Sequence, residues 1–221
     1  MKVLVMSSNA PVAPETSLQI PTFDGPLGRR IIETHIWAVR EGLNGASARD
    51  LFDGYCQRLV IHGVPLWRGY ATMQTLHPQW SGYGYTWRRD INAIQPDQYM
   101  RSDIGSPGWL GSPIYSLVRR AREGEIDPVM RRRLEAGPEQ RDFLMLNEFF
   151  GEGATDYFAQ IFAFGRGDPS QGTGIAYSFM ADRRGGFDEN DIALLQSTLP
   201  GLSLAMKAHA GHVIASALLR T

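Results

Sequence analysis

The first part of the chain shows helical periodicity in two stretches. Apolar residues begin at Leu27 and recur every three or four positions as far as Asn44. A second stretch starts behind Ser47, which forms a capping-box-like start with Asp50, and it closes at Gly63. The pattern predicts two helices in succession.

The last stretch, residues 187–221, predicts a long C-terminal helix. Asp188 occupies the N-cap position, and Phe187 and Ile192 are spaced as a hydrophobic staple across it. Pro200 and Gly201 fall inside the helix and are expected to bend or weaken it, because Pro lacks an N–H donor and crowds the preceding turn.

Apolar residues recur along this C-terminal helix at heptad-like spacing. The candidate contacts for a dimer or an output partner are Leu199, Leu202, Met206, His209 and Val213. The alternative is that the first half of the row packs on the back of the sheet, as in any amphipathic helix.

Between the helices the hydrophobic period changes to that of strands. Four segments are predicted as strands, at residues 64–76, 80–89, 155–165 and 173–182. In the second of them Tyr83, Tyr85 and Trp87 fall on one face, because side chains alternate along a strand.

The middle of the chain, residues 90–137, is mixed. Pro96, Pro107 and Pro113 interrupt it, and short helices are expected at residues 112–122 and 128–134. Residues 140–150 are ambiguous between helix and strand, and their end favours a helix. Elements in this order indicate an α+β domain with a central antiparallel sheet. Two N-terminal helices and the C-terminal helix are expected on one face, with the irregular insert over the other.

Composition narrows the functional classes. The chain of 221 residues is 43% hydrophobic with a formal net charge of -1, which is typical of a globular domain and gives no reason to expect nucleic acid or a membrane as a partner. Cys56 is the single cysteine, which excludes an intramolecular disulfide and fits a reducing, cytoplasmic compartment. No histidine or cysteine spacing indicates a metal site, so we expect no metal.

Two features resemble a GAF domain. Gly153-Ala154-Thr155-Asp156-Tyr157 leads into a strand, and Phe187-Asp188-Glu189-Asn190-Asp191 opens the last helix. The middle of the chain is similar to the N-terminal region of bacterial class III adenylate/guanylate cyclases. The motifs that carry this similarity are Pro65-Leu66-Trp67-Arg68, Thr75-Leu76-His77-Pro78, Tyr85-Thr86-Trp87-Arg88 and Ser112-Pro113-Ile114-Tyr115.

The resemblance implies a GAF-like fold and a regulatory role without catalytic residues. In these cyclases the region precedes a catalytic domain that works as a dimer, so a homodimer is expected. The expected division is a proline-rich arm over residues 1–26, a sensor over 27–200 and an output or connector helix over 201–221, directed towards a catalytic domain outside this sequence.

Aromatic residues of the middle region are the candidate ligand-binding residues, and two arginines could bind an anionic group of the ligand. The candidate set is Trp67, Arg68, Tyr70, Tyr83, Tyr85, Trp87, Arg88, Tyr99 and Tyr115. The ligand is an unidentified small effector, and no cofactor is otherwise expected. The alternative is that the aromatic residues fill an ordinary core and the chain is a structural dimerisation module without a ligand.

Overall fold

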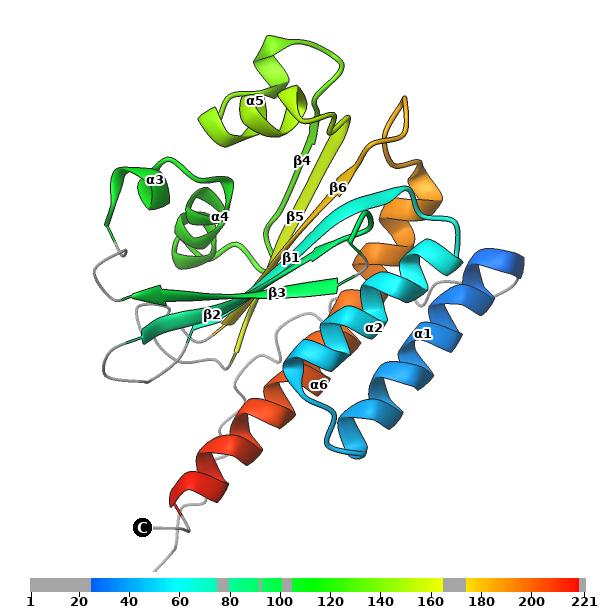
Figure 1. The fold of residues 1–221 in the computed structure, drawn as a ribbon, viewed down its shortest axis with the longest axis vertical. Coiled ribbons are helices and arrows are strands. Elements are labelled where there is room, and N and C mark those ends of the chain that lie inside the picture. The colour runs from blue at the N-terminus through cyan, green and yellow to red at the C-terminus, as the bar shows by residue number, and fades with distance from the viewer. Residues whose placement is uncertain (1–24, 75–79, 92, 101–104, 165–173, 219–221) are drawn as a thin grey trace, which may run out of the picture.

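A six-stranded sheet forms the centre of the molecule. The computed structural model describes residues 25–74, 80–91, 93–100, 105–164 and 174–218. The strands lie in the order β3-β2-β1-β6-β5-β4, and each neighbouring pair is antiparallel (Figure 1). Their bounds are β1 (Leu66–Gln74), β2 (Trp80–Arg88), β3 (Ala93–Met100), β4 (Val129–Arg133), β5 (Asp156–Ala163) and β6 (Gly174–Ala181).

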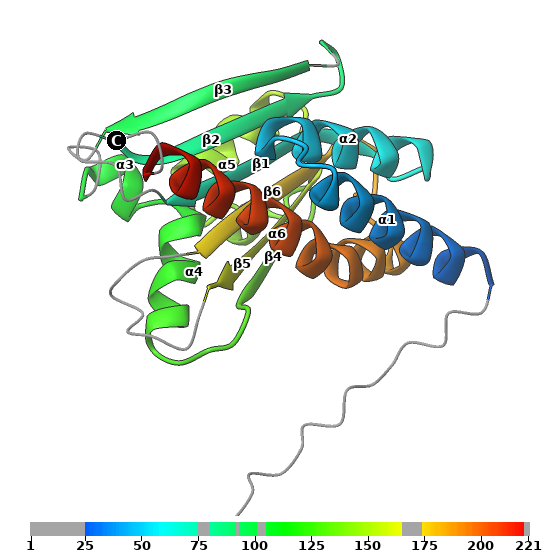
Figure 2. The same cartoon turned by 90° about the horizontal axis from the view of Figure 1, so that it is seen from below.

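Three long helices cover one face of the sheet, which we call the helix side. They are α1 (Gly25–Leu43), α2 (Ala48–Ile61) and α6 (Glu189–Leu218). Helices α1 and α6 lie side by side and run in the same direction (Figure 2). In the part of the chain that the structure describes, no helix is long and apolar enough to cross a membrane.

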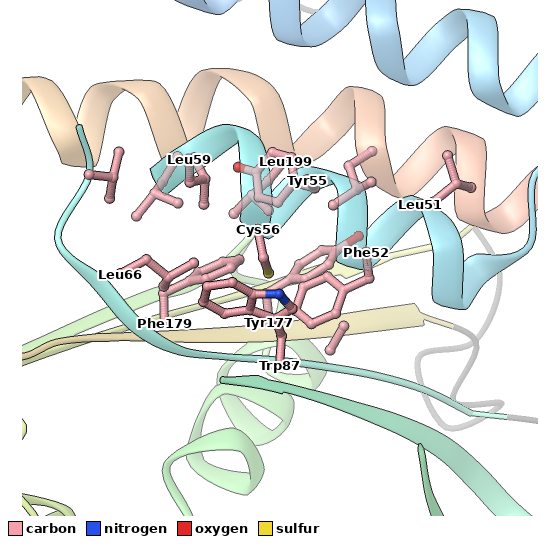
Figure 3. Packing of buried hydrophobic residues seen from close by; sticks show 14 of the residues in the cluster. Leu51, Phe52, Tyr55, Cys56, Leu59, Leu66, Trp87, Tyr177, Phe179 and Leu199 are labelled. Carbon is pink, nitrogen blue, oxygen red and sulfur yellow. The ribbon is translucent and has the colours of Figure 1, made fainter. Parts of the chain in front are cut away.

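The main core lies between the sheet and these helices. Phe52 of α2 points towards Tyr177 and Phe179 of β6 (Figure 3), whereas the Tyr55 hydroxyl lies 2.8 Å from that of Thr198 in α6. These side chains and that of Leu51 are all buried. The rings of Tyr177 and Phe179 stack with their centroids 6.2 Å apart. Burial of large aromatic side chains is the main stabilising contribution of such a layer.

The opposite face of the sheet, which we call the insert side, carries shorter elements. These are α3 (Pro107–Leu110), α4 (Pro113–Arg122), a 3-10 turn η2 (Pro138–Gln140) and α5 (Leu144–Gly151). A second buried cluster forms beneath them and includes Leu117, Leu146, Tyr157 and Met180. The predicted α+β architecture, with helices on one face and the insert on the other, is therefore confirmed.

The predicted helix caps are confirmed in detail. The Ser47 hydroxyl accepts a hydrogen bond from the backbone N–H of Asp50 at the start of α2. At the start of α6, Asp188 and Asp191 each accept from the backbone N–H of the other, at 2.8 and 2.9 Å. Satisfying free N–H groups in this way stabilises a helix start by about 1 kcal/mol.

Two sequence predictions in the middle region are wrong. Residues 128–134 were expected to be helical, but Val129–Arg133 form edge strand β4, paired with β5. Residues 93–100, within the region expected to be irregular, form the opposite edge strand β3, although they contain Pro96. Proline is tolerated on an edge strand because one side of that strand needs no hydrogen-bond donors.

Helix α6 continues through Pro200 as one element. Leu202, Ser203, Ala205 and Met206, which follow the proline, are all buried. The body of the domain therefore extends beyond residue 200, where the sequence had suggested a boundary. The predicted arm lies almost wholly outside the described residues.

Candidate functional site

The predicted ligand-binding residues divide between the two faces of the sheet. Strands β1 and β2 are paired so that Gly69 lies opposite Trp87, and Ala71 opposite Tyr85. These four positions face the helix side, and Trp87 and Tyr85 pack with its core. Tyr83 shares their face, opposite Met73.

The one-faced arrangement of Tyr83, Tyr85 and Trp87 is thus confirmed, but the face is the one that α2 covers. Trp87 is 1% exposed and lies beneath Cys56 in Figure 3. Its indole Nε1 is buried without a hydrogen-bond partner among the described residues. Tyr85 and Trp87 therefore pack as the alternative interpretation expected, as aromatic side chains of the core.

The other candidates of β1, β2 and α4 lie on the insert side. A register shift in β1 places both Trp67 and Arg68 on this side, and Tyr70 follows two positions later. Arg88 lies directly opposite Arg68 across the β1–β2 pair. Tyr115 of α4 contacts Trp109 of α3, with ring centroids 5.7 Å apart. Tyr99 pairs with Gly82 on edge strand β3, and its side chain is outside the described part of the structure.

Arg68 is surrounded by aromatic rings. Its guanidinium carbon lies 5.0 Å from the ring centroid of Phe149 and 5.8 Å from that of Tyr70. Its Nη2 donates to the Thr86 hydroxyl at 3.3 Å. Cation–π contacts of this kind help to hold a guanidinium at a fixed position.

Arg88 is held by a carboxylate. Its Nε and Nη2 donate to the two oxygens of Asp90 at 3.0 and 2.9 Å, and its guanidinium lies 5.5 Å from the Trp67 ring centroid. The hydrogen bonds to Asp90 raise the pKa of Arg88, and those from Arg88 lower the pKa of Asp90. Like charges directly opposite each other on one face repel, and the Asp90 carboxylate offsets this repulsion at Arg88.

Tyr157 of β5, which sequence analysis did not select, lies beneath the insert. It is 1% exposed and hydrogen-bonded to Ser178 of β6. Burial raises the pKa of its phenol, and the nearby Arg68 and Arg132 offset part of that rise. The phenol is therefore protonated in the neutral pH range and offers both a donor and an acceptor.

Small side chains occupy the centre of the insert side. Thr72 of β1 lies opposite Ala176 of β6, and Ser178 lies between Tyr70 and Ala159. Small side chains allow other groups to approach the sheet closely. Alternation along residues 155–165 and 173–182 assigns these small side chains to one face of the sheet. The sequence does not reveal that the insert covers that face.

A charged cluster connects the insert strand β4 with the start of α6. Arg131 of β4 makes a salt bridge of 2.8 Å to Asp156, which is fully buried. Arg131 also donates to the Phe187 carbonyl and to Glu189 at 3.3 Å. Asp156 in turn accepts from the backbone N–H of Phe187 at 3.1 Å. Arg131 and Asp156 thus join β4 and β5 to the first turn of α6.

The candidate contacts on α6 are mostly core residues. Leu199, Leu202 and Met206 are each 0% exposed and pack against the domain's own sheet and helices. They have no surface to offer a second copy, which corrects their proposed use as dimer contacts. His209 is partly exposed, and the side chain of Val213 lies outside the described part of the structure.

Neither cysteine chemistry nor a metal site gains support from the structure. Cys56 is buried in the main core, and burial raises the pKa of its thiol well above the usual value, which disfavours the reactive thiolate. The residues that the structure describes contain no cluster of three or more metal-ligating side chains. His77 lies outside these residues.

No protein-family model matches the sequence, and no curated protein matches it. Solved structures do resemble the fold, and two of them are as follows. The phycoerythrobilin-bound GAF domain from a cyanobacterial phytochrome has a TM-score of 0.50 at 10% identity, covering 82% of this chain and 97% of that one. The fold is GAF-like. The VqsR LBD domain from Pseudomonas aeruginosa has a TM-score of 0.46 at 15% identity, covering 81% and 96% of the two chains.

Proposed function

We propose that the chain is a regulatory domain that binds a small anionic effector on the insert side of its GAF-like sheet. The observation that carries this proposal is the position of Arg68, held between Phe149 and Tyr70 with Arg88 directly opposite. Aromatic walls with a few convergent polar groups are what small-molecule sites use. Trp67 lies on the same side of the sheet, and Tyr157 and Ser178 are buried beneath the insert.

We further propose that the effector acts through α6. Strand β6 separates the two layers, with Ser178 on the insert side and Tyr177 on the helix side. The Tyr177 hydroxyl lies 3.1 Å from that of Ser203 in α6, and Arg131 joins β4 to the start of the same helix. An effector that binds one arrangement of these contacts more tightly than another shifts the population of α6 positions.

The parent system in this proposal is a bacterial class III nucleotide cyclase, whose catalytic dimer the domain controls. Support comes from the sequence motifs around Trp67, Arg88 and Tyr115 that resemble the regulatory region of such enzymes. The test is to read the DNA downstream of the codon for Thr221. A class III catalytic domain in the same frame is the expected result, and a stop codon with no cyclase gene beside it contradicts this part.

Effector binding is tested by thermal unfolding of the full chain with a panel of aromatic carboxylates and nucleotides, cyclic nucleotides included. Ligand that binds only the folded state raises the unfolding temperature. We expect an anionic compound to stabilise the wild-type chain and Arg49→Ala, a control on the exposed surface of α2, but not Arg68→Ala. If no compound shifts the transition, the chain is better described as a structural module without a ligand.

A further inference from the structure

A row of apolar side chains lies on the outer surface of α1. Ile32, Ile36, Val39 and Leu43 are 40%, 47%, 50% and 82% exposed. They follow one another at intervals of four, three and four residues, which is the spacing of a helix–helix contact seam. The opposite side of α1 is buried against the domain, so this row is not part of the domain's own core.

Helix α6, which packs beside α1, also carries an exposed apolar side chain. Gly42 of α1 packs so closely on α6 that a Cβ there would lie 2.9 Å from the Cβ of Ala205. Leu204, next to Ala205, is 66% exposed. A surface built from two packed helices is rigid, which lowers the entropic cost of binding.

Charged residues of opposite sign flank the row on one side. Glu33 and Arg40 each follow a seam residue directly, are seven residues apart and are exposed. Within the described residues neither forms a salt bridge. The corresponding positions on the other side of the seam are His35 and Gly42, which give these charges no partner of opposite sign.

Two helices can pack through such a seam in two directions, and the charges distinguish them. In a parallel pair the flank of Glu33 and Arg40 faces the opposite flank of the other helix, where His35 and Gly42 lie. In an antiparallel pair about a twofold axis the same flanks face each other. Glu33 of each copy then lies near Arg40 of the other, and both pairs of charges attract.

We propose that α1 is the contact surface for a second copy of this chain, with the two α1 helices antiparallel about a twofold axis between Ile36 and Val39. The contact is isologous, so both copies bury the same row and it closes as a dimer. Because α1 and α6 run in the same direction, the two α6 helices end on opposite sides of this dimer. If α6 leads into a further domain, as in the proposed function on which this point rests, the pairing holds the two further domains of the dimer apart.

Sedimentation equilibrium of the full chain tests the pairing through charge reversal. Glu33→Arg and Arg40→Glu alone each place like charges together, and we expect each to weaken the dimer about tenfold. The double variant, Glu33→Arg with Arg40→Glu, restores opposite charges only in an antiparallel pair and is expected to return to the wild-type dissociation constant. A monomeric wild-type chain, or a double variant weaker than both single variants, overturns the proposal.

Cysteine cross-linking tests the direction independently, since the native Cys56 is buried. In the antiparallel pair Leu43 of one copy lies near Ile32 of the other. A mixture of Leu43→Cys and Ile32→Cys chains is therefore expected to form a disulfide-linked dimer, while Leu43→Cys alone is not. Self-linkage of Leu43→Cys indicates the parallel pair and overturns the proposal.

The pairing and the effector site can fail separately. Ile36→Asp places a charge in the seam at a position that is 47% exposed, so we expect it to abolish the dimer while the circular dichroism spectrum stays unchanged. Arg68 lies on the insert side of the sheet, away from α1. Effector binding is therefore measured on the Ile36→Asp variant as well. Loss of the dimer with binding retained is the expected result. A variant that stays dimeric contradicts the pairing, whatever the binding result.

Discussion

The imidazole of His35 in α1 lies against Gly201 in α6. A Cβ at Gly201 would lie 2.5 Å from His35 Nδ1, and His35 Nε2 lies 2.6 Å from the carbonyl oxygen of Ser197. Because a carbonyl oxygen only accepts, Nε2 carries the proton and donates. The glycine that the sequence suggested as a weak point in α6 is therefore a position where α1 packs closely.

This contact predicts that Gly201→Ala destabilises the protein, although alanine is normally the better helix former. The added methyl group displaces the imidazole, at a cost of about 1–3 kcal/mol in the free energy of unfolding. Chemical denaturation measures the effect, with Gly151→Ala as a control because no atom lies near that position. Adding His35→Ala should relieve the clash, so a double variant less stable than either single variant contradicts this reading.

The burial of Leu199 predicts that it stabilises the domain itself. Leu199→Ala is expected to lower the free energy of unfolding by about 2–5 kcal/mol, the usual cost of a large cavity in a packed core. Leu144→Ala is the control, because Leu144 is 76% exposed on α5 and its truncation should change stability little. A Leu199→Ala chain that keeps its stability but changes its association would return this residue to a dimer contact.

The cluster at the start of α6 predicts a difference between two neighbouring arginines. Arg131→Ala leaves the buried carboxylate of Asp156 without its cation and should cost about 3 kcal/mol. Arg133→Ala removes only a salt bridge of 3.4 Å to Glu189, which is 82% exposed, and should cost at most about 1 kcal/mol. Urea unfolding of both variants makes the comparison, and equal losses contradict it.

The loss in Arg131→Ala should also depend on pH. Burial raises the pKa of Asp156, and the hydrogen bonds from Arg131 lower it in part. Without Arg131 the folded-state pKa rises further, so the folded chain holds its proton more tightly than the unfolded chain. Stability then falls as pH rises through that pKa. The destabilisation should accordingly be smaller in acid than at neutral pH, and the reverse trend contradicts the role of this carboxylate.

Local patterns predicted the long helices and the strands that carry strong alternation. Ser47 with Asp50, and Asp188 with its first turn, identified the helix starts from sequence because capping depends on residues three positions apart. Edge strands β3 and β4 escaped prediction because their stability comes from pairing with β2 and β5, which no local pattern records.

The candidate site was predicted only in part for a related reason. Alternation places Tyr85 and Trp87 on one face, but it does not reveal that α2 covers that face. The register shift that keeps both Trp67 and Arg68 on the insert side depends on the pairing of β1 with β6. Tyr157 and Phe149 reach Arg68 from distant parts of the chain, so only the folded arrangement identifies them as its neighbours.

The most direct test of the central claim, effector binding on the insert side, is to follow the tryptophan indole N–H signals by NMR during titration with a compound from the thermal screen. Trp67 and Trp109 lie with the insert cluster, whereas Trp37 packs under Arg58 on the outer helices. We predict saturable shifts of the Trp67 and Trp109 signals, an unchanged Trp37 signal, and no shifts in Arg68→Ala. Shifts confined to Trp37, or shifts that persist unchanged in Arg68→Ala, contradict the proposed site.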